Sequence, residues 1–554
     1  MASILERFLP RTEFSSYEDF IENYKVNVPA DFNFGYDVVD AWAELEPGKL
    51  ALWRIDDHGG EKKYTFGEMK RVSNKAANFF AGLGVKKGDS VMLTLKQCHE
   101  YWPCVTALHK IGAVVIPAVS QLTHKDIIYR NNAAGVSAII TFSGDKRLLE
   151  EIRLSLAESP TVRHVICVGE QDFGYLDFYG GIEGQPDTFP RPAGAAATSA
   201  GDHFMIYFTS GTTGMPKMAM HDFTYPLGHI TTAKYWQRVQ NGKLHLTSSD
   251  SGWAKFSWGK IYGQWICGAA IFAYDFDRFS PVRMLEVMQN YPIATYCSPP
   301  TQYRFMIQED VQAYDLSSIE HFTTAGEPLN PEVFNKWKSV TGKEIVEGFG
   351  QSESSVLLAN YKWFSPKPGS MGRPAPLYDM GIVDDDGNAC DEGIEGHVVV
   401  RGLDRRWPTG LFRYYYNDEA LNREAFRNGC YYTGDVAWVD SDGHYWFVGR
   451  SDDMIKSSGY RIGPFEVESA LIEHKAVVEC AVTGAPDPIR GLVVKATIVL
   501  ARGYEASDAL AKELQDHVKK VTAPYKYPRI IEFVDELPKT ISGKIKRREI
   551  RNKS

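Results

Sequence analysis

Residues 209–217, with the sequence T-S-G-T-T-G-M-P-K, constrain the fold and chemistry of this chain more than any other stretch. They follow the apolar run F-M-I-Y-F at 204–208, whose length and aromatic content are typical of a buried strand. A loop of Gly, Ser and Thr after a strand gathers backbone N–H groups and hydroxyls around a small volume. Such a volume suits an anion with many oxygens, above all a polyphosphate. Gly211 and Gly214 allow the backbone to approach closely, and Lys217 supplies a positive charge.

This stretch is not a Walker A loop, because Met215 and Pro216 separate Gly214 from Lys217. For an isolated run of small residues, a flexible surface loop is the simpler interpretation. The remainder of the chain therefore decides between a phosphate site and a surface loop.

Composition places the chain among globular proteins and narrows its partners. The 554 residues are enough for three or four domain-sized units, and 44% hydrophobic with 24% charged residues is ordinary. A net charge of −9 argues against nucleic acid as the main partner. The eight cysteines include no C-x-x-C pair, the first ten residues lack a signal-peptide pattern, and no apolar run is long enough to span a bilayer. We therefore expect a cytoplasmic protein without a membrane span.

Strand-like and helix-like segments alternate between residues 64 and 142, which indicates an α/β domain with a mainly parallel sheet. The last hundred or so residues read as a separate small domain, with strands at 477–482 and 492–500 and a helix at 508–521. We predict a large N-terminal α/β domain with mixed and parallel sheets, residues 1–451, and a small mobile α+β domain, residues 452–554.

Further motifs follow the Gly-rich loop along the chain. They are S-G-W-A-K-F-S-W-G-K-I-Y-G-Q-W at 251–265, T-A-G-E-P-L at 324–329 with E-G-F-G-Q-S-E at 347–353, Y-T-G-D at 432–435, G-R-S-D-D-M-I-K-S-S-G-Y-R-I at 449–462, and P-K-T-I-S-G-K-I-K-R-R at 538–548. Each has a plain interpretation by itself: core tryptophans, solvated acids such as Glu327 and Glu353, or a basic tail. The segment at 347–353 is not a Rossmann fingerprint, because residue 353 is Glu instead of Gly.

Taken together and in this order, the motifs resemble those of the adenylate-forming superfamily, and look closest to the medium-chain acyl-CoA synthetases. The resemblance covers nearly the whole chain, and Ser352 replaces the more common Thr without loss of the hydroxyl. It implies two half-reactions. A carboxylic acid and ATP, with Mg²⁺, form acyl-AMP and pyrophosphate, and coenzyme A then displaces AMP. The partners implied are therefore small molecules.

The resemblance also implies a role for each matching residue. Lys544 is the catalytic lysine, Glu353 is the magnesium carboxylate, and Asp452 is the hinge about which the small domain rotates between half-reactions. Asp435 and Arg450 contact the ribose, and Arg461 faces the nucleotide. The full set implied to bind ATP is Thr209, Ser210, Gly211, Thr212, Thr213, Gly214, Lys217, Gly326, Glu327, Pro328, Glu347, Gly348, Phe349, Gly350, Gln351, Ser352, Asp435, Arg450, Arg461 and Lys544.

The acyl and coenzyme A channel is implied to pass Trp253, Gly350, Ser458, Gly459 and Lys519. Acetyl-CoA synthetases carry a Trp at the position of Gly350, so glycine is expected to leave room for acids of roughly four to eight carbons, branched and aromatic ones included. In the alternative, Gly350 only permits a turn, and another side chain such as Trp253 or Trp258 closes the pocket.

Two other functions stay open at this point. An acyl-AMP ligase would pass the acyl group to a carrier protein instead of coenzyme A. A non-catalytic nucleotide-binding protein on the same scaffold is expected to have lost Lys544 or Glu353, and this chain keeps both.

Overall fold

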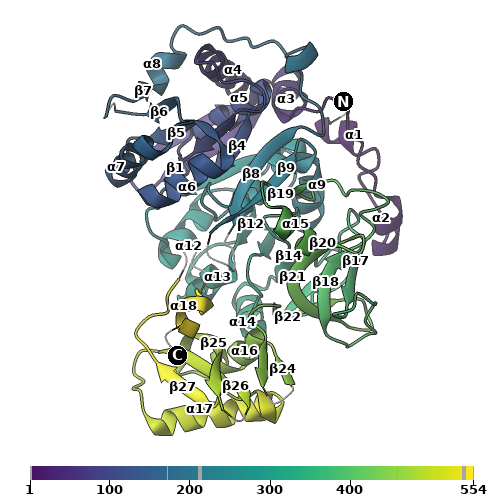
Figure 1. The fold of residues 1–554 in the computed structure, drawn as a ribbon. Coiled ribbons are helices and arrows are strands. Elements are labelled where there is room, and N and C mark those ends of the chain that lie inside the picture. The colour runs from purple at the N-terminus through teal and green to yellow at the C-terminus, as the bar shows by residue number, and fades with distance from the viewer. Residues whose placement is uncertain are drawn as a thin grey trace.

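The computed structural model describes residues 3–170, 173–209, 215–457, 460–488, 490–539 and 545–552. A large body carries the N-terminal and central parts of the chain, and a smaller C-terminal lobe lies at one end of it (Figure 1). This arrangement confirms the predicted α/β fold with a small C-terminal domain. The boundary at 451/452 falls in the turn between β22 (Tyr445–Arg450) and β23 (Ile455–Ser457) and stays a prediction.

The first sheet of the body holds the strand that precedes the Gly-rich loop. Within the described residues it has eight strands in the order β19-β9-β8-β4-β3-β5-β6-β7, parallel except where β9 pairs with β8 and β19. Their bounds are Tyr414–Tyr415, Lys217–Asp222, His203–Thr209, Val114–Pro117, Ser90–Leu93, Val136–Phe142, His164–Val168 and Leu176–Asp177. Helices of this part of the body are α4 (Phe66–Gly82), α5 (Tyr101–Ile111), α6 (His124–Ala134), α7 (Lys146–Ser155) and α8 (Phe178–Ile182).

The second sheet of the body joins a parallel half to an antiparallel half. The parallel half contains β1 (Leu50–Asp56), β11 (Ala270–Asp275), β10 (Leu244–Thr247), β12 (Ile293–Ser298), β13 (His321–Thr324) and β14 (Ile345–Phe349), with β2 (Glu61–Thr65) antiparallel at its edge. The antiparallel half contains β15 (Leu358–Ala359), β16 (Ser370–Pro374), β22, β21 (Cys430–Val439), β18 (Gly396–Val400) and β17 (Met380–Val383), and β20 (Phe426–Arg427) pairs with β21. Residues 440–444 form the turn that joins β21 and β22 as a hairpin.

Short helices pack around these sheets, and the first residues of the chain form an arm against the body. The arm carries α1 (Ile4–Phe8), α2 (Tyr17–Asn23), the π-helix η1 (Gly35–Asp40) and α3 (Ala41–Leu45). The other helices of the body are α9 (Tyr225–Ile230), the π-helix η4 (Thr231–Trp236), α10 (Ala254–Gly259), α11 (Tyr262–Ile266), α12 (Pro281–Asn290), α13 (Pro300–Met306), α14 (Pro331–Thr341) and α15 (Glu419–Ala425), with 3₁₀ turns at Leu156–Glu158, Gly194–Ala196 and Val311–Ala313.

The C-terminal lobe has its own core, as the sequence predicts. Over the described residues its sheet contains β24 (Tyr460–Ile462), β23, β26 (Gly491–Leu500), β25 (Val477–Asp487) and β27 (Ile530–Phe533). Helices α16 (Pro464–Ile472) and α17 (Asp508–Val521) bury one stripe each against it, while α18 (Arg547–Asn552) and the turn Pro524–Lys526 follow. The predicted helix at 508–521 has the same bounds as α17, since Ser507 caps it and Leu510, Leu514 and Val518 are buried.

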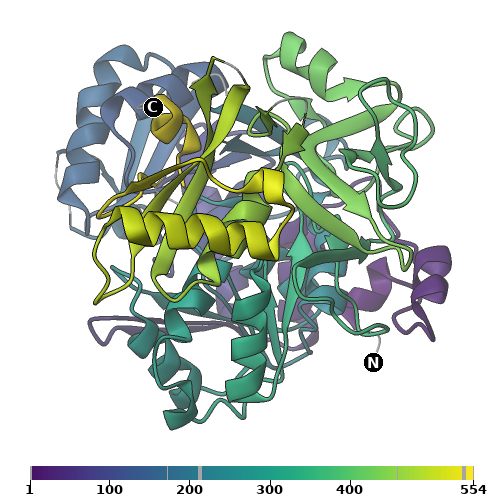
Figure 2. The same cartoon turned by 90° about the horizontal axis from the view of Figure 1, so that it is seen from below.

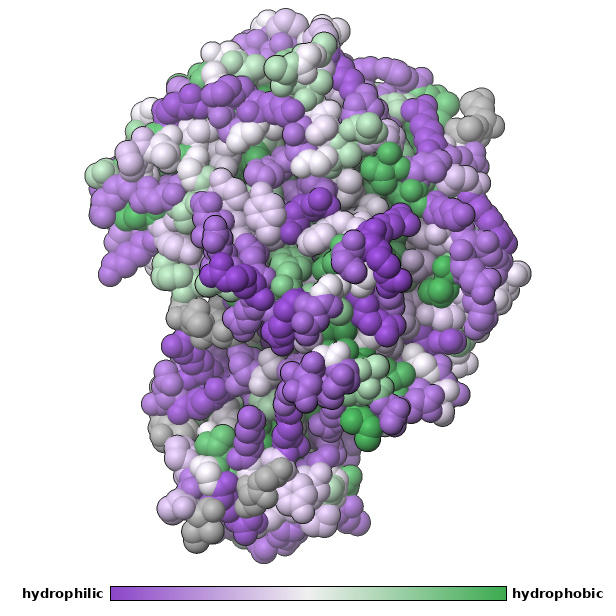
Figure 3. All heavy atoms as spheres, turned by 45° about the vertical axis from the view of Figure 1, so that its right-hand side comes forward, coloured by the Kyte–Doolittle hydropathy of each residue, from purple (hydrophilic) through white to green (hydrophobic). Residues whose placement is uncertain are grey.

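Figure 2, seen from below, shows the lobe lying across that end of the body with α17 toward the viewer. The face in Figure 3 is mainly hydrophilic, with scattered hydrophobic side chains and a narrowing above the lobe. Among the helices of the described ranges, none is both long and apolar enough to cross a membrane.

Candidate active site

A cleft of about 1330 Å³ lies between the body and the C-terminal lobe. Its lining contains every described residue predicted to bind ATP except Arg461, together with Glu353 and Asp452. These residues are Thr209, Lys217, Gly326, Glu327, Pro328, Glu347, Gly348, Phe349, Gly350, Gln351, Ser352, Asp435 and Arg450. The lobe contributes α16 and the segment around Ile545 and Lys546. The structure thus brings together motifs that are up to about 240 positions apart in the body alone (Thr209 to Arg450).

Sheet topology explains this gathering. Strands β13 and β14 are parallel neighbours, so the segments that follow them, 325–328 and 350–353, leave the same edge of the sheet. Strands β8 and β9 pair antiparallel with Thr209 opposite Lys217, which holds both ends of the Gly-rich loop together. Asp435 and Arg450 lie opposite each other on β21 and β22.

Some predicted site residues lie outside the described residues. They are Ser210, Gly211, Thr212, Thr213, Gly214, Ser458, Gly459 and Lys544. Their roles remain predictions from the resemblance, while the described neighbours Thr209, Lys217 and Ile545 line the cleft.

Three other predicted residues do not line this cleft. Arg461 lies on β24, where its Nη1 is 3.2 Å from Oδ2 of Asp385. Lys519 lies on α17, with its Nζ 2.9 Å from Asp516 Oδ1. Trp253 precedes α10 and packs against the hydrophobic cluster of the first sheet. In this arrangement of the lobe, Arg461 therefore does not face the cleft as expected, because its hairpin β23–β24 carries it to Asp385.

A hydrogen-bonded network surrounds the buried carboxylate of Asp435. Arg450 Nη1 donates to Oδ1 at 3.0 Å, and Gln351 Nε2 donates to Oδ2 at 2.6 Å. Tyr431 donates its hydroxyl to Gln351 Oε1 at 2.8 Å, which fixes the orientation of the amide. The Asp435 charge raises the pKa of Arg450, so this cation is held at the cleft wall.

Glu353 presents a second carboxylate to the cleft. Tyr415 donates its hydroxyl to Glu353 Oε1 at 2.8 Å, and burial together with this carboxylate raises the pKa of Tyr415. Lys217 Nζ lies 5.5 Å from the centre of the Tyr415 ring, within reach of a cation–π contact. Tyr415 therefore contacts both Glu353 and Lys217, which belong to different motifs.

Sequence reasoning did not single out Tyr415, Tyr431 or His221. His221 is buried on β9, and its Nε2 donates to the backbone oxygen of Ser352 at 2.7 Å, so it braces the segment before Glu353. Burial lowers its pKa to about 3, which keeps the ring neutral. These contacts span 62 to 131 positions, and no local pattern around these residues indicated them.

The space beside Gly350 differs from the expected open pocket. A Cβ atom at Gly350 would lie 2.3 Å from Cη2 of Trp258 and 2.8 Å from the backbone oxygen of Ser355. Trp258 therefore fills the volume that glycine was expected to leave free. Trp236 lies next to it, with ring centroids 6.0 Å apart and planes at 90°, and packs against Gly348. The structure favours the alternative in which Trp258 closes this side.

Glu347 is a buried carboxyl in the cleft wall, and burial raises its pKa well above the ordinary 4.5. A hydrogen bond from the Leu329 backbone lowers the pKa by a smaller amount. The folded protein then keeps a proton that the unfolded chain releases above pH 4.5. Stability is expected to fall as pH rises from 4.5 toward the folded pKa. We expect Glu347→Gln to remove this loss. The Tm of the variant should therefore rise relative to that of wild type between about pH 5 and about pH 8.

Thermal unfolding across pH measures this effect. Glu344→Gln is the matched control, because Glu344 lies at the surface and pairs with Lys338 at 2.8 Å. Parallel Tm curves for wild type and Glu347→Gln would contradict the assignment of a raised pKa to Glu347.

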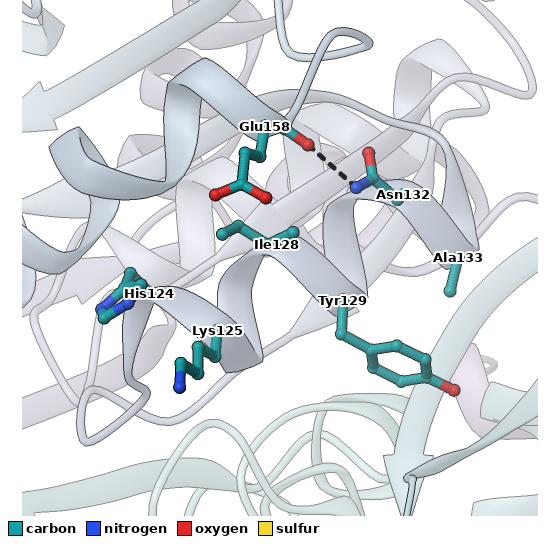
Figure 4. A pocket seen from close by; sticks show the side chains of 7 residues that line it. All are labelled: His124, Lys125, Ile128, Tyr129, Asn132, Ala133 and Glu158. Atoms are coloured by element: carbon teal, nitrogen blue, oxygen red, sulfur yellow. Dashed lines mark hydrogen bonds between the residues drawn. The ribbon is translucent and has the colours of Figure 1, made fainter.

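A second cavity, of about 690 Å³, lies on the outer side of α6 (Figure 4). Its lining residues are His124, Lys125, Ile128, Tyr129, Asn132, Ala133 and Glu158. None of the residues predicted to bind ATP, acid or coenzyme A lines this cavity.

Comparison with known proteins agrees with the cleft. The family model of the AMP-binding enzymes matches residues 39–416, and that of the AMP-binding enzyme C-terminal domain matches residues 466–544. The chain is 41% identical to the acyl-coenzyme A synthetase ACSM3 of Mus musculus, over 98% of this chain and 93% of that protein. It is 43% identical to ACSM5 of Homo sapiens, over 95% and 91%.

Solved structures show the same fold. The anthranilate CoA ligase AuaEII in complex with anthranoyl-AMP has a TM-score of 0.86 and 29% identity, covering 95% of this chain and 98% of that one. A benzoate CoA ligase from Burkholderia xenovorans has a TM-score of 0.81 and 27% identity, covering 94% and 100%.

The same comparison contradicts the expected cytoplasmic location, because these ACSM relatives are named as mitochondrial proteins. The expectation came from general features of composition, which do not identify a compartment. Identity over nearly the full length, two matching family models and the gathering of the motifs in one cleft agree on the chemistry, with ATP and coenzyme A as substrates. The chain therefore belongs to the AMP-binding enzyme family and is an AMP-forming acyl-CoA synthetase.

Proposed function

We propose that the cleft between body and lobe binds ATP and a medium-chain, branched or aromatic carboxylic acid, forms acyl-AMP, and then admits coenzyme A. The observation that carries this proposal is the gathering of Lys217, Glu353, Asp435 and Arg450 around one cleft. Two carboxylates and two cations at its wall match a ligand with both hydroxyl donors and phosphate anions.

Asp435 is proposed to hold the ribose. Arg450 and Gln351 donate to its two carboxylate oxygens. A carboxylate can also accept hydrogen bonds from two adjacent hydroxyls. Because Gln351 and Arg450 fix both oxygens, the carboxylate is oriented before the nucleotide arrives.

Glu353 is proposed to hold Mg²⁺. Within the described ranges, no group of three or more His, Cys, Asp or Glu side chains is arranged to bind a metal. Mg²⁺ often uses one or two protein carboxylates together with substrate phosphates and waters. The residues therefore fit an ion that enters with ATP. When bound, Mg²⁺ would neutralise charge on the phosphates.

The first half-reaction joins two anions, so its barrier is largely electrostatic. An oxygen of the carboxylic acid forms a bond to the α-phosphorus of ATP, and the bond from that phosphorus to pyrophosphate breaks. Lys217, which lies on β9 at the end of the Gly-rich loop and lines the cleft, is proposed to hold the leaving pyrophosphate. Lys544 is proposed to stabilise the charge that develops at the reacting centre.

In the second half-reaction the sulfur of coenzyme A bonds to the acyl carbon, and AMP leaves. We propose that the lobe rotates about Asp452 between the two steps, as the resemblance implies. Asp452 lines the cleft in the turn that joins body and lobe. Such a rotation is proposed to bring Ser458, Gly459 and Arg461 toward the cleft, with Trp253 and Lys519 along the route of coenzyme A.

The acid is proposed to lie beside the segment 348–350, bounded by Trp258 and Trp236. Two structurally similar proteins are named for anthranilate and benzoate, which are aromatic acids. An aromatic wall suits such rings and branched chains alike.

Replacement of Trp258 is expected to change acid preference. Trp258→Ala removes the ring that fills the space beside Gly350, so acids longer by one to three methylenes should gain in kcat/KM relative to wild type. Each methylene that becomes buried adds about 0.8 kcal/mol, or roughly fourfold in relative kcat/KM. The measurement is kcat/KM for a series of straight-chain acids.

Trp53→Ala is the control, because the Trp53 ring packs against Phe272 and Tyr291, with ring centroids 5.8 and 5.4 Å away, and has no place in the proposed channel. An unchanged ranking of acids in Trp258→Ala would show that another side chain limits the pocket. Gly350→Trp is expected to be a poor probe, because its side chain would overlap Trp258.

One assay tests the proposed reaction as a whole. AMP formation is measured with a panel of aliphatic and aromatic acids, with and without coenzyme A, and the thioester is identified by mass. We expect sustained AMP release only with coenzyme A. Transfer to a carrier protein but not to coenzyme A would support the acyl-AMP ligase instead, and a lack of AMP formation with every acid would exclude the proposed acid classes.

A further inference from the structure

Helix α6 contacts both ends of the Gly-rich loop. Tyr129 donates its hydroxyl to the backbone oxygen of Pro216 at 2.9 Å, one residue before Lys217. The Tyr129 ring also meets Phe208, the residue before Thr209, edge-on at 6.1 Å between centroids. On the same helix the Arg130 guanidinium lies 5.1 Å from the centre of the Phe208 ring. One turn of α6 thus contacts the chain on either side of residues 209–215.

The helix is itself held firmly on its other side. Asn132 donates to the backbone oxygen of Glu158 at 2.9 Å, and Asn131 donates to Ser159 Oγ at 3.0 Å. His124 is 2.8 Å from Glu151 on α7. Figure 4 shows Asn132 joined to Glu158 while Tyr129 points away from both. The outer contacts therefore brace the helix, and Tyr129 extends to the loop.

A third contact links α6 to the neighbourhood of Glu353. Asn417 donates to the backbone oxygen of Ala133 at 3.3 Å, and the preceding Tyr416 donates its backbone N–H to Met218 at 2.8 Å. Tyr415, whose hydroxyl donates to Glu353, directly precedes Tyr416 in the chain. The position of α6 is thereby coupled to β9 and to the strand that carries Tyr415.

We propose that Tyr129 is a positioning residue for ATP: its hydrogen bond to Pro216 holds the end of the Gly-rich loop, and so the backbone of Lys217, in place for the phosphates. This inference rests on the proposed role of Lys217 in ATP binding. A fixed backbone at Pro216 and Lys217 lowers the entropy lost when ATP binds. Tyr129 lies outside the lining of the cleft and acts through the loop.

The test is Tyr129→Phe in the full-length enzyme, with KM for ATP, pyrophosphate exchange and thioester formation from supplied acyl-AMP as readouts. Phenylalanine keeps the ring against Phe208 and removes only the hydroxyl. Loss of one neutral hydrogen bond is expected to raise KM for ATP roughly threefold to tenfold. Thioester formation from acyl-AMP should stay within about twofold of wild type, and Tm within about 2 °C.

Tyr175→Phe is the matched control. Tyr175 donates to the backbone oxygen of Leu149 at 3.1 Å on α7, a similar bond that does not reach the loop. It should leave KM for ATP unchanged. The inference is overturned if Tyr129→Phe keeps KM for ATP within twofold of wild type, if both half-reactions fall together, or if Tyr175→Phe gives the same rise.

A parallel variant, Lys217→Ala, separates this inference from the proposed function. If Lys217→Ala raises KM for ATP and Tyr129→Phe does not, only the role of Tyr129 is wrong. If Lys217→Ala leaves KM for ATP unchanged, the proposed phosphate role of Lys217 is wrong, and the inference fails with it.

Discussion

Replacement of Lys544 by alanine is expected to lower the rate of adenylation by about a thousandfold and to leave thioester formation from supplied acyl-AMP within about twofold of wild type. The lysine is the one residue of the final motif that the resemblance assigns to chemistry. Its described neighbours Ile545 and Lys546 line the cleft. A cation there would face the charge that develops when carboxylate and ATP react.

The asymmetry between half-reactions is the informative part of this prediction. Thioester formation displaces AMP and transfers no phosphoryl group, so it does not need the same cation. Pyrophosphate exchange measures the first half-reaction, and conversion of chemically prepared acyl-AMP measures the second. Lys539→Ala is the control from the same motif, because Lys539 lies outside the cleft lining and its Nζ is already paired with Glu479 at 2.7 Å. Equal losses in both half-reactions would contradict the separate use of Lys544.

Replacement of Asp435 by asparagine is expected to lower kcat/KM for ATP by about a hundredfold or more. The carboxylate accepts from Arg450 and Gln351, and an amide would turn one acceptor oxygen into a donor facing one of these donors. The guanidinium would lose the negative charge that raises its pKa, and the nucleotide would lose its acceptor for the ribose. Both effects weaken ATP binding, so KM for ATP should rise more than kcat falls.

The control for this variant is Asp442→Asn, in the exposed turn that joins the same two strands. Asp442 pairs with Lys367 at 2.6 Å and lies outside the cleft lining. It should leave kcat/KM for ATP within about twofold of wild type. If Asp435→Asn changed KM for the acid and left KM for ATP unaltered, the proposed ribose contact would be wrong.

Much of the site could be predicted from the sequence because its motifs follow strands. The run F-M-I-Y-F before 209 is apolar and short, and the described ends of the loop after it, Thr209 and Lys217, line the cleft. The segments after 324 and 347 were indicated by their resemblance to family motifs. Local pattern and motif order therefore indicated the residues at the strand ends, such as Thr209, Glu327 and Gln351. The contacts among them depend on the sheet order, which places β13 beside β14 and β21 beside β22.

The side chains around the motifs were harder to predict. Tyr415 and Tyr431 reach Glu353 and Gln351 across 62 and 80 positions, and neither belongs to a recognisable motif. The sequence left Trp253 and Trp258 as two side chains that could close the pocket. Only the tertiary structure distinguishes them, because Trp258 lies against Gly350 and Trp253 packs against the first sheet. The location of Arg461 beside Asp385 depends on how the lobe sits on the body.

The sequence by itself determined the family, through the resemblance of its motifs and their order. It also determined the α/β body and the helix at 508–521, because these follow from local periodicity and turn residues. Tertiary structure alone decided that Trp258 occupies the space beside Gly350, that Asp435 shares its oxygens between Gln351 and Arg450, and that Tyr129 meets Pro216. The physical reason is the same in each case. These contacts join elements that are distant in the chain, and their partners are chosen by strand order and side-chain packing, which local pattern does not encode.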